Sequence, residues 1–101
     1  MTTMRTLIEI EMDTATANQA IADGTIEASM DKMMEMLKPE AAYFFARMGR
    51  RAALLVVDLP DEAAIVPTLE PAWLNLNADV TMTPCMNADE LRTGLSRLNG
   101  S

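Results

Sequence analysis

The stretch Arg50-Arg51-Ala52-Ala53-Leu54-Leu55-Val56-Val57-Asp58-Leu59-Pro60 decides the fold of this chain. Its middle, residues 52–57, is uncharged and rich in aliphatic and β-branched side chains, and Asp58 and Pro60 close it. A run with this length and these boundaries predicts a strand that is buried on both faces, rather than a helix. Such a strand lies in the middle of a sheet, so we expect further strands on either side of it.

Composition predicts a single globular domain, residues 1–101, in a reducing cytoplasm. The chain is 50% hydrophobic and 23% charged, as folded domains are. Its one cysteine, Cys85, cannot form an internal disulfide, and the N-terminal residues lack the pattern of a signal peptide. No apolar run approaches the roughly 20 residues that cross a bilayer. The formal net charge of −7 argues against nucleic acid and anionic membranes as partners.

Three further segments alternate between apolar and other residues, which predicts three more strands. Residues 4–12 place Thr6, Ile8 and Ile10 on one face and Arg5, Leu7, Glu9 and Glu11 on the other. Residues 41–48 place Tyr43, Phe45 and Arg47 together, opposite Ala42, Phe44, Ala46 and Met48. A short turn at residues 49–51 joins this segment to the opening stretch as an antiparallel hairpin. Residues 79–85 form the last strand, with Pro84 at its end.

The segments between these strands show the residue spacing of helices. Thr16 and Gln19 fit a capping box that starts a helix reaching Leu37, and Gly24 makes this helix irregular. After Asp61 a second helix begins, but Pro67 and Pro71 are expected to break it into short turns.

A third, C-terminal helix follows a cap at residues 87–90. Leu91, Leu95 and Leu98 share one face of this helix.

The element order predicts an α+β, ferredoxin-like βαββαβ fold with a four-stranded antiparallel sheet and a short C-terminal helix. Two connecting helices cover only one face of such a sheet. The other face combines apolar and charged side chains, and a monomer would leave them exposed. We therefore expect a homodimer in which two sheets pair as a dimeric α/β barrel and enclose a small cavity.

The chain resembles the dimeric α/β-barrel superfamily, especially its small muconolactone-isomerase-like and uncharacterised members. Two motifs carry the resemblance: Val56-Val57-Asp58-Leu59-Pro60-Asp61-Glu62-Ala63 runs from a strand into a helix, and Ala78-Asp79-Val80-Thr81-Met82-Thr83-Pro84-Cys85-Met86-Asn87-Ala88-Asp89-Glu90-Leu91 runs from a strand to a helix cap. The superfamily includes isomerases, monooxygenases, haem-binding enzymes and proteins without known activity, so the resemblance implies a fold more than a function. It transfers no catalytic residue.

Several kinds of chemistry are excluded by residue type. The chain has no histidine, which excludes Ser-His-Asp and Cys-His catalysis and the usual histidine metal sites. One cysteine cannot build a zinc site, and Gly-rich phosphate loops are absent. We expect no metal and no cofactor.

Carboxylate and arginine chemistry remains. Glu9 and Glu11 are two residues apart on one strand, so both point toward the expected cavity, and Glu9 is the candidate catalytic base. Arg47 is the candidate anchor for a substrate carboxylate, with Glu11 also in the binding set. The alternative is structural: Glu9 or Glu11 pairs with Arg47, or lies at a solvated rim.

Tyr43, Phe45 and Trp73 are candidates for an aromatic ligand pocket, and ordinary core or interface packing is the alternative. The methionines at positions 30, 33, 34 and 36 are interpreted as core gap-fillers, and Cys85 as an inert packed residue.

Two functions follow from these candidates, and the sequence leaves open whether the protein is an enzyme. The first is a cofactor-independent isomerase or monooxygenase-like enzyme that binds a small apolar carboxylic metabolite in the barrel cavity. The alternative is a non-catalytic dimeric binding or assembly module.

Overall fold

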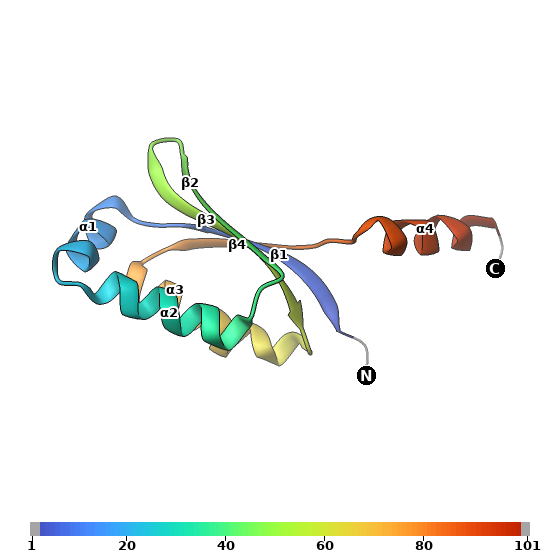
Figure 1. The fold of residues 1–101 in the computed structure, drawn as a ribbon, viewed down its shortest axis with the longest axis horizontal. Helices are drawn as coiled ribbons and strands as arrows, with labels where there is room; N and C mark the ends of the chain where they lie inside the picture. Colours follow the sequence, from blue (N-terminus) through green and yellow to red (C-terminus); the bar gives the residue numbers. More distant parts are fainter. Residues whose placement is uncertain (1–2, 100–101) are drawn as a thin grey trace.

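The structure, a computed structural model, describes residues 3–99 and has an α+β fold (Figure 1). Residues 1–2 and 100–101 of the expected domain lie outside the described part. The elements in chain order are β1 (Met4–Glu11), α1 (Thr14–Ala22), α2 (Thr25–Leu37), β2 (Ala41–Arg47), β3 (Arg50–Leu59), the short 3-10 helix η1 (Glu62–Ala64), α3 (Ile65–Leu76), β4 (Asp79–Pro84), α4 (Ala88–Ser96) and η2 (Arg97–Asn99).

The four strands form one antiparallel sheet in the order β2-β3-β1-β4. The opening stretch is β3, which lies between β2 and β1, as its apolar character requires. Within one chain the sheet is open and does not close into a barrel, because β2 and β4 remain as edges.

Helices α1, α2 and α3 lie on one side of the sheet (Figure 1). Ile8 of β1 is paired with Leu55 of β3, and both side chains point into the core between sheet and helices. Burial of a side chain of this size stabilises the folded state by roughly 1.5–3 kcal/mol. The core also contains buried residues from both central strands, the three helices and two connections between elements: Ile10, Met12, Ala17, Ala20, Met33, Ala53, Val57, Leu59, Leu69, Ala72, Leu76 and Ala78.

The other side of the sheet, which we call the open face, is covered by no helix of residues 3–99 (Figure 1). Side chains alternate between the two faces along each strand, so the residues next in sequence to the core residues lie on the open face. Leu54 is opposite both Glu9 and Tyr43, and Val56 is opposite Leu7. Leu7, Leu54 and Val56 are half-buried, whereas Tyr43 is 63% exposed. The predicted division of each strand into two faces is confirmed.

The helix predicted from Thr16 to Leu37 is two helices. Asp13, rather than Thr16, caps the first, because its carboxylate accepts a hydrogen bond of 3.0 Å from the backbone N–H of Thr16. The predicted Thr16–Gln19 capping box is therefore wrong. Gly24, with φ of 79°, separates α1 from α2, since this left-handed conformation suits glycine and ends regular helix.

The prediction that prolines break the second helix is also wrong. α3 runs without interruption from Ile65 to Leu76 and includes Pro71. Pro67 lies in its first turn, where a missing N–H costs no intrahelical hydrogen bond. Pro71 removes one bond from the interior, at a cost of about 3 kcal/mol. Burial of Leu69, Ala72 and Leu76 against the sheet offsets this cost.

The β2–β3 hairpin turns one residue earlier than predicted. Met48 and Gly49 both have positive φ, 53° and 82°, which is the pattern of a two-residue type I′ turn. Arg50 and Arg51, predicted to lie in the turn, are instead the first residues of β3.

Candidate functional site

An ion pair lies on the open face. Arg47 Nη1 is 2.8 Å from Glu9 Oε2, and the two side chains are 44% and 31% exposed. The Arg47 guanidinium also lies over the ring of Phe45, 5.4 Å from its centroid, in a cation–π contact. Glu9 comes from β1 and Arg47 from β2, so the pair spans the intervening strand β3. The structure thus brings together the candidate base and the candidate anchor, in the paired arrangement that was the alternative interpretation.

The remaining open-face candidates surround this pair. Phe45 and Glu11 are both opposite Ala52, and Tyr43 is opposite Leu54. Glu9, Glu11, Phe45 and Arg47 line one small hollow together with Asp79 and Thr81. Its volume is about 40 Å³, whereas sites for small organic ligands occupy roughly 300–1,000 Å³. A single chain therefore has side chains that could bind a carboxylate, but the hollow beside them is too small for a metabolite.

Trp73 lies apart from this group. It is on α3, which packs on the core side of the sheet, while Tyr43 and Phe45 are on the open face. Ala72 and Leu76 point into the core, and Trp73 is 40% exposed on the outer part of the helix. The expected cluster of three aromatic residues therefore does not form: Tyr43 and Phe45 lie on one side of the sheet, and Trp73 lies on the other.

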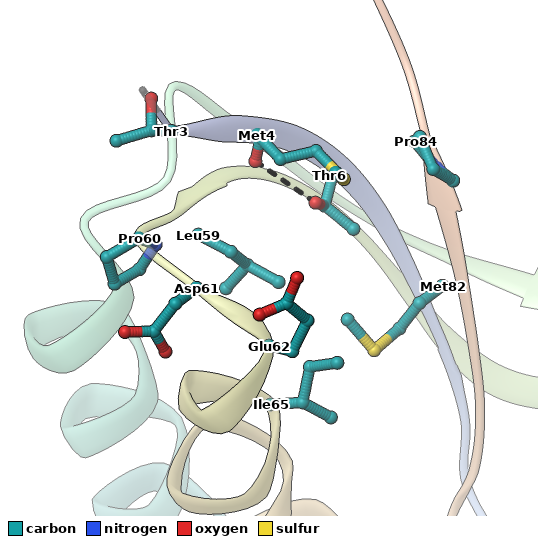
Figure 2. A pocket seen from close by; sticks show the side chains of 10 residues that line it. All are labelled: Thr3, Met4, Thr6, Leu59, Pro60, Asp61, Glu62, Ile65, Met82 and Pro84. Carbon is teal, nitrogen blue, oxygen red and sulfur yellow. Dashed lines mark hydrogen bonds between the residues drawn. The ribbon is translucent and has the colours of Figure 1, made fainter. Parts of the chain in front are cut away.

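A larger groove, absent from the sequence-based candidates, lies at one end of the sheet (Figure 2). Its volume is about 460 Å³. It forms where the start of β1, the end of β3, the start of α3 and the end of β4 meet, so only the folded topology brings its walls together. We call it the end groove; its lining residues are Thr3, Met4, Thr6, Leu59, Pro60, Asp61, Glu62, Ile65, Met82 and Pro84.

Two carboxylates lie on this apolar groove and differ in their roles. Asp61 Oδ1 accepts a hydrogen bond of 3.0 Å from the Ala64 N–H and thereby caps η1. Figure 2 shows the Glu62 carboxylate turned toward the middle of the lining side chains, and that of Asp61 turned away. Among the interactions identified in residues 3–99, the side chain of Glu62 takes part in no hydrogen bond and no ion pair. The end groove therefore favours a cationic or hydrogen-bond-donating occupant over a carboxylate.

The other candidates have structural roles. Met33 is buried in the core, and Met30 and Met34 pack beside it, as expected for gap-filling methionines. Met36 is 49% exposed, so its interpretation as a core gap-filler is wrong. The backbone N–H of the half-buried Cys85 donates a 3.0 Å hydrogen bond to the Arg5 carbonyl. Among residues 3–99 we find no group of three or more acidic, cysteine or histidine side chains positioned to hold a metal ion. That same part of the chain contains no helix with the length and apolarity to span a membrane.

In comparisons with known proteins, no protein-family model, no curated protein and no solved structure matches the chain.

Proposed function

We propose that the protein is a ferredoxin-like subunit of a homodimer that binds a small apolar carboxylic acid between two open faces. The strand order β2-β3-β1-β4, with β1 and β3 central, supports a pairing of the dimeric α/β-barrel kind. So does the one-sided cover of the sheet, because half-buried Leu7, Leu54 and Val56 would gain burial against a second copy. The lone cysteine supports a cytoplasmic location.

The ion pair between Glu9 and Arg47 is the observation that carries the ligand class. Arginine binds carboxylates through two parallel hydrogen bonds, and Phe45 holds its guanidinium from one side. A ligand carboxylate would take the place of Glu9 on Arg47. The released Glu9 would then lie beside the bound ligand, in a site from which the second copy excludes water.

This exchange suits a cofactor-independent isomerase. Glu9 would accept a proton from a carbon atom next to an activating group of the ligand and return it to a different carbon. The reaction has no net change in oxidation state and needs no further reactant. A monooxygenase of the same kind would additionally require dioxygen.

A non-catalytic dimeric module is the second candidate, and one observation favours it. Glu9 and Arg47 already satisfy each other, and the hollow beside them measures only about 40 Å³. In this alternative the pair fixes the alignment of two open faces, and the dimer binds no metabolite.

Binding of phenylacetate, with uncharged phenylacetamide as its control, separates the two candidates. The carboxylate-binding proposal expects phenylacetate to shift the NMR signals of Arg47 and Phe45, and expects Arg47→Met to abolish the shift of the Phe45 signals. Phenylacetamide should have no effect at the same concentration. No shift with either compound, together with a change of dimer stability in Glu9→Gln, would favour the non-catalytic module.

A further inference from the structure

The C-terminal helix α4 extends away from the rest of the molecule (Figure 1). It packs substantially only against η2, which continues it. The molecule is 56 Å long, and its radius of gyration of 15.8 Å exceeds the value of about 13 Å that is typical of a compact chain of this size. Because α4 packs little against its own sheet, its leucines are largely exposed in the single chain.

These side chains form a regular stripe. Leu91, Leu95 and Leu98 fall on one face of α4 and η2, with exposed fractions of 47%, 52% and 80%. A helix of 9 residues is marginal in water on its own, and Gly94 lowers its helical preference by about 1 kcal/mol more. A leucine stripe on such a helix is typical of a segment that packs against another surface.

The start of α4 is fixed so that the helix points outward. The backbone N–H of Cys85 donates to the Arg5 carbonyl of β1 at 3.0 Å, and the Arg5 side chain forms ion pairs with Glu40 and Glu90. Asn87 and Glu90 also form a capping box, with both hydrogen bonds at 2.8 Å. For α4 to fold back onto its own sheet, the contacts of Cys85 and Glu90 with Arg5 would have to break.

The end groove lies at the end of the sheet from which α4 departs, because Pro84 both lines the groove and ends β4. The groove is largely apolar, and Glu62 faces into it. The leucine stripe is flanked by Arg92 and Arg97. Arg92 pairs with Asp89 within α4, and no partner of Arg97 is identified among the described side chains. The groove and the helix are therefore complementary in both apolarity and charge.

We propose that α4 of one chain docks in the end groove of a second copy, with its leucines on the apolar walls and Arg97 facing Glu62. The α4 of the second copy docks in the end groove of the first in the same way. The contact is therefore a reciprocal exchange that forms a closed, two-fold symmetric dimer. This exchange uses neither the ion pair nor the aromatic residues of the open face. It is thus independent of the proposed ligand-binding dimer.

Sedimentation equilibrium of the full chain tests the apolar part of the contact. Replacing Leu91 and Leu95 with Asn should weaken association by about tenfold or more for each leucine, because each loses the burial of one side chain. Thr93→Gln is the matched control: it is exposed on the opposite face of the same helix and should leave association unchanged. Equal association of the double variant and the wild type would overturn the proposal.

Mixing two charge variants tests the pairing and shows whether it joins different chains. Glu62→Lys alone and Arg97→Glu alone should each associate weakly, since both place like charges in the contact. A mixture of the two should associate more tightly than either variant, because each helix then meets a groove of opposite charge on the other chain. A mixture no tighter than its components would overturn the exchange.

A small molecule as the occupant of the groove gives a different result. In that case the charge variants would leave association unchanged. Hexylamine, a small apolar amine, would then shift the NMR signals of the groove residue Ile65 in the wild type but not in Glu62→Gln. That outcome would overturn the exchange. If Tyr43→Lys left the association of the open faces unchanged while the charge-swapped mixture still associated, the proposed function would be overturned and the exchange would stand.

Discussion

Glu9 and Arg47 form an ion pair of 2.8 Å across a strand that belongs to neither of them. Glu9 is on β1 and Arg47 on β2, and β3 lies between. Small Ala52 of β3 lines the hollow that these side chains share, which leaves room above the strand for the two long side chains to meet. The ion pair between Glu9 and Arg47 therefore depends on the small side chain of Ala52, which belongs to the stretch that decides the fold.

A double-mutant cycle with Glu9→Gln and Arg47→Met measures this pair. In dilute samples of single chains, we expect a coupling of roughly 0.2–1 kcal/mol, since solvent screens a partly exposed ion pair. At concentrations where open faces are paired, the coupling should increase, because removal of one partner then leaves the other charge buried. Urea unfolding of the four proteins at both concentrations gives the two values. Equal coupling at both concentrations would mean that the pair stays solvent-exposed.

The core depends on β3, and Leu55→Ala tests it. Leu55 is 1% exposed, and its truncation should lower the free energy of unfolding by about 2–5 kcal/mol through lost burial and a residual cavity. Leu74 is 75% exposed on α3, so Leu74→Ala should change stability by about 0.5 kcal/mol or less. Denaturant unfolding of both variants provides the comparison. Similar effects from the two leucines would contradict the observed packing.

The division of the strands into two faces was predictable because it depends only on local alternation. Leu55 and Leu54 are adjacent in sequence, yet one enters the core and the other the open face, as the period of two requires. The ion pair could be predicted only as an alternative, since the reach of Arg47 across β3 depends on how the strands are paired.

Other features depended on tertiary packing that local patterns do not contain. Pro71 predicts a break in a helix, but burial of α3 on the sheet outweighs the lost hydrogen bond. Trp73 lies away from Tyr43 because α3 covers the core side of the sheet. The end groove has walls from β1, β3, α3 and β4, so no single segment predicts it. The segment Pro60-Asp61-Glu62 predicts a strand that leads into a helix cap, and the structure confirms this. Nothing in the segment predicts that Glu62 faces a groove.

Acid should weaken the helix starts in a defined way. The hydrogen bond from the Thr16 backbone, followed by that from its hydroxyl, lowers the pKa of Asp13 below its ordinary 3.8. A lowered folded-state pKa means that Asp13 stabilises the fold above pH 3.8 and loses this effect as the pH falls through the folded-state pKa. Asp13→Asn keeps a capping side chain that does not titrate. Its unfolding midpoint should therefore decrease less than that of the wild type between about pH 6 and about pH 2.5.

Asp23 offers an independent repeat of this measurement. Hydrogen bonds from the Thr25 hydroxyl and then from the Thr25 backbone lower the pKa of Asp23 in the same direction. Asp23→Asn should likewise reduce the loss of stability in acid. If both asparagine variants lost as much stability as the wild type, these carboxylates would not contribute to its acid sensitivity.

The hairpin turn between β2 and β3 requires glycine at position 49 because of its backbone conformation, and not because space is short. A Cβ at Gly49 would meet no atom within 4 Å, but φ there is +82°. Gly49→Ala should therefore cost about 1–2 kcal/mol from the left-handed conformation and nothing from steric contact. Gly94, in α4, also has open space around it and no positive φ. Gly94→Ala should not destabilise the protein and should raise its helical circular dichroism. A harmless Gly49→Ala would contradict the type I′ turn.

The central claim is that a second copy covers the open face, and sedimentation velocity of the wild type and Tyr43→Lys tests it most directly. Tyr43 is 63% exposed on that face, and Leu74→Lys, on the outer side of α3, is the control. We predict that the wild type and the control sediment well above the 11.1 kDa of one chain at micromolar concentration, and that Tyr43→Lys forms smaller species. A wild type that stays at 11.1 kDa throughout would contradict the account.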